Sequence, residues 1–297
     1  MSWIALALLA PFFWAVSNFV DKYCLERYTK TVSDFLVFTS LTNWIAVPIL
    51  LWYFGVPAVS PAALIPLATG ALLLYSYGLY AKALQLGETS QLVILFKLGP
   101  IFTLTFAFLF LGQMISGKEF LAFLLLLAGT LFVSIERNKG RLFFIKGFGW
   151  ILGAILMWSM IYIIADYALS FMSFGEFMVY DTIGSTIGIL PLLLSSRVRR
   201  EAYAGFKNAV PAKYGWYTLN NLLDMFAQLS MKKALSLAPS AGLVSAITQV
   251  QSFYAIAFGV VLTLFLPQFF RENISPRAVG IKIIGAVVMF SGVWLLL

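Results

Sequence analysis

The chain has 297 residues, of which 61% are hydrophobic and 11% are charged, and its formal net charge at pH 7 is +8. Soluble domains carry about 25% charged residues, so this composition excludes a soluble globular protein and indicates an all-α integral membrane protein. Cys24 is the sole cysteine and histidine is absent, which excludes an intrachain disulfide and leaves proton chemistry to carboxylates, lysine or tyrosine.

Ten segments of the chain are apolar and long enough to form transmembrane helices, since a span needs about 20 apolar residues. In chain order they are residues 3–20, 35–54, 62–84, 90–111, 119–135, 149–171, 174–194, 215–237, 241–266 and 278–297. The first segment has neither a basic leader nor a cleavage site, so we expect a retained helix rather than a signal peptide.

Basic residues are distributed unevenly between the two sides of these helices. Sixteen of the 20 lie in alternate connections, starting with the one after the first helix. Lys118, Lys232 and Lys233 lie on the other side, and Lys97 lies within the fourth helix. The positive-inside rule therefore places both termini outside the cytoplasm. Because topology explains the positive charge, no nucleic-acid partner is expected.

The two halves of the chain resemble each other. "KALQLGETSQLV" (82–93) and "KALSLAPSAGLV" (233–244) agree at seven of twelve positions when Thr89 is matched with Ser240. "DFLVF" (34–38) and "EFMVY" (176–180) open the second and seventh helices. The halves are then residues 1–138 and 142–297, and because five is odd, the second half is inverted in the membrane. Chance alignment of two apolar halves is the alternative.

Four stretches carry a family resemblance: "FWAVSNFVDKY" (13–23), "KLGPIFTLTFAFLFLGQ" (97–113), "AGTLF" (128–132) and "ENISPRAVGIKIIGAVVMFSGVWLL" (272–296). In this order they resemble the EamA-type branch of the drug/metabolite transporter superfamily. The resemblance implies a ten-helix transporter in the cell inner (plasma) membrane, with a substrate cavity enclosed by the first, third, fourth, sixth, eighth and ninth helices. Gln113 departs from the glutamate common at that position, and the extracytoplasmic termini depart from the usual family topology.

Charged residues inside spans are candidates for function because each costs roughly 2.5 to 3.5 kcal/mol near a helix centre on insertion scales. Lys97 and Asp224 come to similar depth from the same side, so we expect them to pair. The pair could be a static ion pair, a substrate-binding pair or a proton-linked switch. Snorkelling of Lys97 to the interface is the alternative. Pro100 should kink this helix and leave the Phe96 carbonyl without its helical partner.

Polar side chains repeat at helical spacing on three helices and could line a cavity or hold helices together. Asn221, Asp224 and Gln228 share one face of the eighth helix, where we favour a cavity wall over interhelical bonding. Ser245 and Thr248 share a face of the ninth helix, although such hydroxyls often bond their own backbone. Trp14 and Asn18 lie four residues apart on the first helix.

Aromatic residues of the third and sixth helices are further candidates. Tyr77, Trp158 and Tyr162 lie deep enough to stack on an organic solute, although membrane aromatics often form an interfacial belt. Asp181 could be a second titrating group, whereas Asp166 is expected to be solvated. Lys82 and Lys233 are expected to be snorkelling anchors.

No catalytic motif or metal-ligand pattern is present in the sequence, so neither an enzyme nor a cofactor is expected. The interpretation is a secondary transporter of a small organic solute that works by alternating access, as a monomer or homodimer, with proton coupling left open. A lipid or lipid-linked headgroup translocator and a membrane scaffold are the alternatives. A polar cavity closed to lipid would favour the solute carrier.

Overall fold

The computed structural model describes residues 2–86, 95–135, 147–207, 209–251, 253–254, 257–258 and 276–296. Within these ranges the chain folds into helices joined by short connections, and no β-strand occurs among them. The helices are α1 (Trp3–Arg27), α2 (Val32–Asn43), α3 (Ala46–Phe54), α4 (Leu64–Leu86), α6 (Gly99–Leu111), α7 (Gly117–Ile135), α8 (Phe148–Leu169), α9 (Phe174–Ile187), α10 (Ser196–Lys207), α11 (Pro211–Leu235), α12 (Ala241–Thr248) and α14 (Pro276–Leu296).

Each expected transmembrane segment contains at least one of these helices, and the second segment is divided into α2 and α3. Residues 90–94 of the fourth segment and residues 252, 255–256 and 259–266 of the ninth lie outside the described residues. Five spans are long and apolar enough to cross a membrane by length and composition: Trp3–Leu25, Val32–Phe54, Pro61–Ala83, Phe148–Leu169 and Phe174–Leu194. Together they indicate a multi-pass membrane protein.

Local sequence explains where the helices begin and end. Ser2, Thr31 and Ser173 cap α1, α2 and α9 by accepting backbone N–H bonds, and Ser173 forms a complete capping box with Glu176. Pro211 occupies the first turn of α11, where its missing N–H costs nothing. Gly112, with φ of 63°, ends α6 in the left-handed conformation that glycine adopts without strain.

The structure corrects one expectation at the start of α6. Residues Phe96–Leu98 form a 3₁₀ turn, and the Gly99 N–H donates to the Phe96 carbonyl. Pro100 has no N–H to donate to the Phe96 carbonyl four residues before it, but in the tighter 3₁₀ turn the N–H of Gly99, three residues after Phe96, donates instead. The Phe96 carbonyl is therefore satisfied within its own helix, and α6 starts at Gly99 rather than continuing through a kink.

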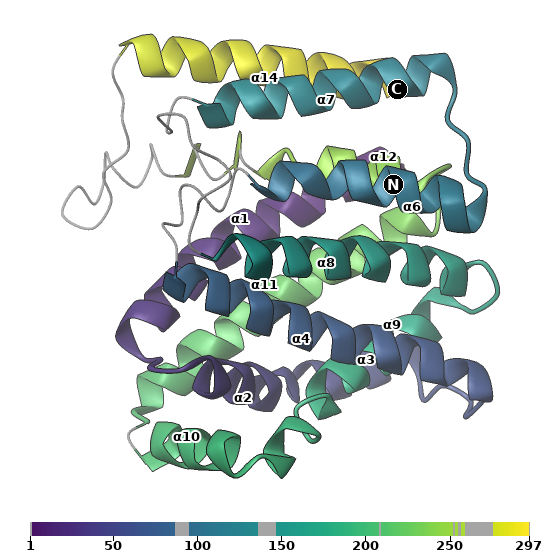
Figure 1. Ribbon diagram of the computed structural model, residues 1–297. Coiled ribbons are helices and arrows are strands. Elements are labelled where there is room, and N and C mark those ends of the chain that lie inside the picture. The colour runs from purple at the N-terminus through teal and green to yellow at the C-terminus, as the bar shows by residue number, and fades with distance from the viewer. Residues whose placement is uncertain are drawn as a thin grey trace.

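The helices pack in pairs across the molecule (Figure 1). α7 packs along α14 at one edge, α1 crosses α11, and α4 packs against both α8 and α9. Small residues allow α4 and α9 to approach closely: a Cβ at Gly70 would collide with the backbone of Asp181, and one at Gly184 with the backbone of Leu67. This contact fixes the inner face of α9 against α4.

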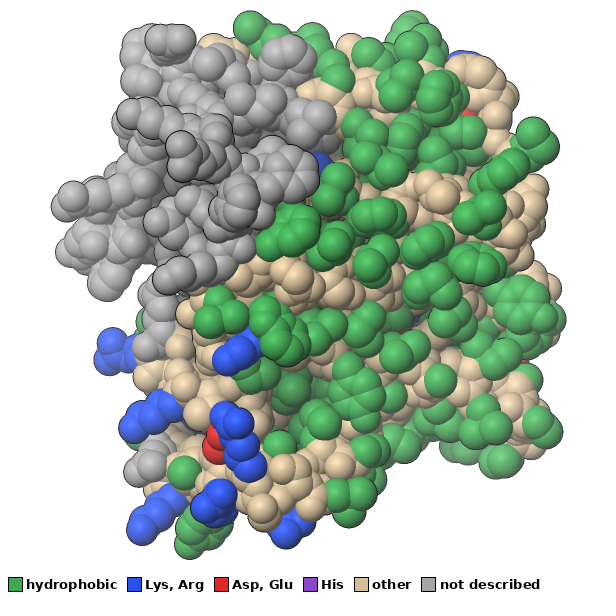
Figure 2. Space-filling view, in the orientation of Figure 1, with side chains coloured by type: hydrophobic (Ala, Val, Ile, Leu, Met, Phe, Trp, Pro, Cys, Tyr) green, Lys and Arg blue, Asp and Glu red, His purple; other side chains and the backbone are tan. Residues whose placement is uncertain are grey.

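Apolar and basic side chains occupy different parts of the surface (Figure 2). Large exposed apolar residues such as Phe108, Leu109 and Ile283 cover α6 and α14. Most of the lysine and arginine side chains visible in this view gather at the lower left, around α10, whereas both chain termini are marked to the right of centre (Figures 1 and 2). Sequence analysis did not foresee α10 as a helix, because the connection is too short and too charged to span a membrane.

Candidate functional site

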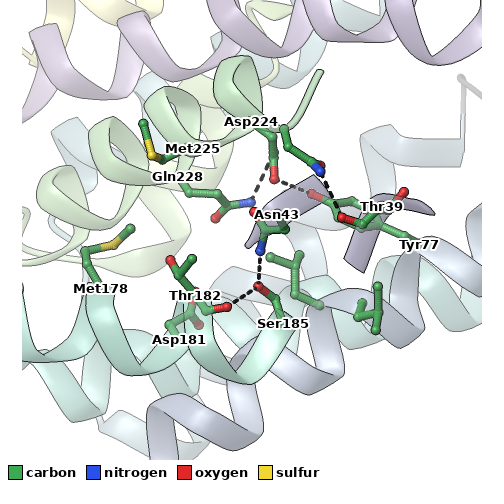
Figure 3. A pocket seen from close by; sticks show the side chains of 13 residues that line it. Thr39, Asn43, Tyr77, Met178, Asp181, Thr182, Ser185, Asp224, Met225 and Gln228 are labelled. Atoms are coloured by element: carbon green, nitrogen blue, oxygen red, sulfur yellow. Dashed lines mark hydrogen bonds between the residues drawn. The ribbon is translucent and has the colours of Figure 1, made fainter. Parts of the chain in front are cut away.

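A small cavity lies among α2, α4, α9 and α11 (Figure 3). Its volume is about 30 Å³, which accommodates water but is far below the roughly 300 to 1,000 Å³ of solute pockets. Nine of the thirteen lining residues are polar and four are Leu or Met: Thr39, Asn43, Leu73, Leu74, Tyr77, Met178, Asp181, Thr182, Ser185, Asn221, Asp224, Met225 and Gln228. A concentration of polar groups at this depth marks protein or water contact rather than lipid contact.

Asp224 is held by uncharged hydrogen-bond donors from three helices. The indole Nε1 of Trp14 on α1 donates to Asp224 Oδ1 at 2.8 Å, and the hydroxyl of Tyr77 on α4 donates to Oδ2 at 3.0 Å. Gln228 Nε2, one turn along α11, lies 3.5 Å from Oδ1. Among the described residues no lysine or arginine nitrogen lies within 4 Å of this carboxylate.

Asp181, on the α9 side of the cavity, is neutralised instead. Lys232 Nζ forms an ion pair with Asp181 Oδ2, and the Thr69 hydroxyl donates to Asp181 Oδ1 at 2.9 Å. Lys232 is fully buried, and its ammonium also lies 5.4 Å from the ring centroid of Phe177. The cavity wall thus combines one carboxylate that pairs with a lysine and one that, among the described residues, is held by neutral donors.

Gln228 presents an acceptor that nothing in the described chain satisfies. The residue is 7% exposed, and its Oε1 is buried without a hydrogen-bond partner. Because Nε2 is directed to Asp224, Oε1 faces the side of the cavity where Thr182 and Asn43 lie (Figure 3). An unsatisfied buried acceptor costs about 1 to 3 kcal/mol, so an acceptor of this kind in a native protein is a candidate for a functional role.

Two amides tie the cavity helices together. Asn43 Nδ2 on α2 donates to Ser185 Oγ on α9 at 2.8 Å. Asn221 Nδ2 on α11 donates to the Thr39 carbonyl on α2 at 2.8 Å. These bonds cross the cavity edges, so enlarging the cavity requires that some of them break.

The expected ion pair between Lys97 and Asp224 is not formed, since it is not among the ion pairs of the described chain, and Asp224 instead accepts hydrogen bonds from Trp14 and Tyr77. Lys97 is 6% exposed, and its Nζ lies 3.4 Å from Gln249 Oε1. Burial at this level also contradicts snorkelling to the interface. The ammonium groups that pair within the described membrane helices are those of Lys213, with Asp34, and Lys232, with Asp181.

Of the site residues expected from sequence, Tyr77, Asn221, Asp224 and Gln228 line the cavity, and Trp14 supports it through Asp224. Trp158 packs against Tyr77, Tyr80 and Phe96 outside the lining. Asn18 is exposed and Tyr162 packs against the main core. Ser245 and Thr248 are buried, and the Thr248 hydroxyl donates to the Ser245 carbonyl. Asp166, expected to be solvated, accepts a hydrogen bond from Gln113.

The contribution of α2 and α9 was not predicted from the sequence. Thr39 and Asn43 share one face of α2, and Thr182 and Ser185 share one face of α9 with Asp181 near them. Their spacing of three or four residues is the signal that could have indicated them. Asp21, at the end of the first span, was not predicted either; its Oδ1 accepts a 2.7 Å bond from Asn220 Nδ2.

The lining therefore differs from the set of helices implied by the family resemblance. That set contained neither the second nor the seventh helix, whereas α2 and α9 supply six of the thirteen lining residues. The described residues contain no group of three or more Cys, Asp or Glu side chains that could hold a metal ion.

Residues 1–135 match the EamA-like transporter family. The match confirms, over that part of the chain, the resemblance predicted from sequence. No curated protein matches the chain. A solved structure described as "Crystal structure of protein" is 14% identical, covers 98% of this chain and 95% of its own, and superposes with a TM-score of 0.56. At that identity the likeness shows a shared overall fold, and nothing about ligands follows.

Proposed function

We propose that this EamA-like chain is a secondary active transporter of a small organic solute, and that the cavity among α2, α4, α9 and α11 is its binding site. The observation that carries the proposal is the Asp224 carboxylate, buried at membrane depth and held by three neutral donors on the wall of a polar cavity. A buried carboxylate of this kind costs stability and persists where it serves a function.

Helix pairing supports the inverted repeat on which alternating access would depend. If the first and second halves exchange, the α1–α11 contact becomes the α8–α4 contact, and α7–α14 maps onto itself; all of these contacts are present. The cavity lies between α2 and α4 of one half and α9 and α11 of the other, which are the pairs that such an exchange relates. A site at a repeat interface is where rocking of the halves would open it to either side.

The polar lining favours a solute carrier over the two alternatives. A translocator of lipid or lipid-linked headgroups needs an apolar path for acyl chains, and a scaffold needs no polar cavity at all. The bunching of basic side chains at one end supports a cytoplasmic location for that end, with both termini on the other side of the membrane.

Transport is tested with purified protein in proteoliposomes, by counterflow and by currents on solid-supported membranes over a panel of small organic solutes. We expect saturable uptake that empty liposomes lack. To test the route, Ser185→Cys is placed in a Cys24→Ser background and treated with a methanethiosulfonate reagent. Modification should block uptake, and excess solute should protect against it.

The same treatment of Tyr203→Cys, which is 70% exposed on α10, serves as the control and should leave uptake unchanged. Flipping of a fluorescent headgroup lipid without solute uptake would favour the lipid translocator. Absence of both activities in well-folded protein would contradict transport altogether.

We further propose that Asp224 carries the coupling proton. The groups around it are Trp14, Tyr77 and Gln228, with the Asp181–Lys232 pair across the cavity and Asp21 on α1. Asp224→Asn should abolish uptake driven by an imposed pH gradient. Uptake by this variant at the wild-type rate would exclude proton coupling through Asp224.

A further inference from the structure

We propose that the cavity binds an organic cation, a protonated amine whose ammonium group lies between the Asp224 carboxylate and the Gln228 side-chain oxygen. The inference rests on the proposed transport function and specifies the solute class that the site selects. Its basis is the charge and the hydrogen-bonding capacity of the described lining.

Charge balance favours a cation at this site when Asp224 is ionised. Of the two carboxylates on the wall, Asp181 is neutralised by Lys232, whereas Asp224 faces only uncharged partners in the part of the chain that the structure describes. With both carboxylates ionised, the lining and its buried lysine sum to one negative charge. An isolated charge in a low-dielectric interior is costly, and an opposite charge within about 4 Å offsets much of that cost.

Hydrogen-bonding capacity points to a donor-rich ligand. The donors of Trp14, Tyr77, Asn43 and Asn221 are already directed to protein acceptors. The Gln228 Oε1 acceptor is left without a partner. An ammonium group carries three donors and no acceptor, so it matches what the wall leaves open. Oε1 and Asp224 lie on the same helix face one turn apart, and both border the cavity (Figure 3).

An anion fits the same wall poorly. A carboxylate or phosphate would face the Asp224 carboxylate and the Gln228 oxygen across a small cavity, and both contacts are repulsive. Lys232, which pairs with Asp181 on this wall, is fully buried and already bonded.

The apolar lining distinguishes an organic cation from an inorganic one. Leu73, Leu74, Met178 and Met225 complete the wall, and Met and Leu side chains cannot replace the hydration shell of a metal ion. They can cover the carbon skeleton of an amine. In solute pockets, apolar side chains commonly cover the carbon skeleton while a few polar groups orient the ligand. A proton and an ammonium group would then compete for Asp224, which would exchange one for the other.

Binding is measured directly, apart from transport, by isothermal calorimetry on the full-length protein in detergent. The probes come in sets of three molecules that share a carbon skeleton, one cationic, one neutral and one anionic. The first set is phenethylammonium, 2-phenylethanol and phenylacetate, and further sets carry alkyl chains of increasing length. Sodium and potassium buffers are compared. Wild type should bind members of the cationic series, with no binding of their neutral or anionic partners and no difference between sodium and potassium.

Two variants test the named contacts. Asp224→Asn should weaken binding of the cation at least about a hundredfold, and Gln228→Leu about tenfold, since each removes a charged or a neutral hydrogen bond to the ligand. Glu201→Gln removes one negative charge from α10 and should bind as wild type does. Melting temperature and gel filtration confirm that each variant is folded.

The outcomes distinguish failure of the cation site from failure of the transport function. Preference for a neutral or anionic member, or cation affinity unchanged by Asp224→Asn, would overturn the inference while leaving solute transport intact. Absence of binding from every cationic set would also overturn it. Sodium-dependent heat in the absence of amine would assign the site to a metal ion instead. If the cation binds and both Asp224→Asn and Gln228→Leu weaken that binding, but proteoliposomes show no uptake, the binding site stands and the transport function is contradicted.

Discussion

Buried charged side chains have different partners at the two ends of α11 and in its middle. Lys213 near the start pairs with Asp34 at 2.7 Å and also lies 3.6 Å from the ring centroid of Phe38, and Lys232 near the end pairs with Asp181. Asp224, between them, is bonded to an indole, a phenol and an amide. The ion pairs at the two ends therefore hold α11 against α2 and α9. The middle of the helix retains a negative charge that a ligand or a proton can neutralise.

The strongest way to break this arrangement is Lys232→Met. It leaves Asp181 buried in the middle of α9 without its cation, which should cost about 3 to 5 kcal/mol of folding free energy. The measurement is unfolding in mixed micelles with increasing SDS, followed by circular dichroism. Lys232→Met combined with Asp181→Asn should recover much of the loss. A double variant as unstable as the sum of the single variants would show that the two groups are not energetically coupled.

A smaller loss is expected from Lys213→Met at the other end of α11. Asp34 lies in the first turn of α2, where the positive end of the helix dipole stabilises a carboxylate. Asp181 has no such position. In the same SDS titration, Lys213→Met should therefore be more stable than Lys232→Met, and equal or reversed losses would contradict this role of the helix terminus.

Replacing the middle charge should change stability less than either end. Asp224→Asn keeps a side-chain oxygen for Trp14 or Tyr77 and removes a charge that no described cation neutralises, so the free energy of unfolding should change by about 1 kcal/mol or less. A loss comparable to that of Lys232→Met would mean that Asp224 fastens helices, as the ends do, rather than serving a ligand.

The smallest effect belongs to a charge outside the membrane. The hydrogen bond from Arg197, with contributions from Ser33 and Thr31, holds the pKa of Glu201 below its ordinary value. A lowered pKa in the folded state stabilises the protein above the ordinary pKa, and this contribution disappears as the pH falls through the lowered value. Wild type should melt slightly above Glu201→Gln at neutral pH, and the difference should vanish in acid and shrink with added salt. A difference that persists in acid would exclude this pair as its source.

Apolar runs and helical spacing predicted much of this molecule. The run lengths located the apolar segments, and the spacing of Asn221, Asp224 and Gln228 placed three cavity residues on one face. The partners across space were not predictable in the same way. Lys97 and Asp224 come to similar depth, but depth does not determine the direction in which a helix turns its side chains. The charge distribution along the chain placed Lys232 on the outer side, whereas it is fully buried and paired with Asp181 of α9.

The small volume of the cavity has a consequence for affinity and selectivity. A solute larger than a few waters binds only after bonds such as Asn43 to Ser185 and Asn221 to the Thr39 carbonyl have opened. Its apparent dissociation constant is then the intrinsic value divided by the fraction of protein that is open. The protein should accordingly bind its substrate weakly, whereas its selectivity among solutes that need the same opening is set by their intrinsic affinities, because the free energy of opening cancels from the ratio of their dissociation constants.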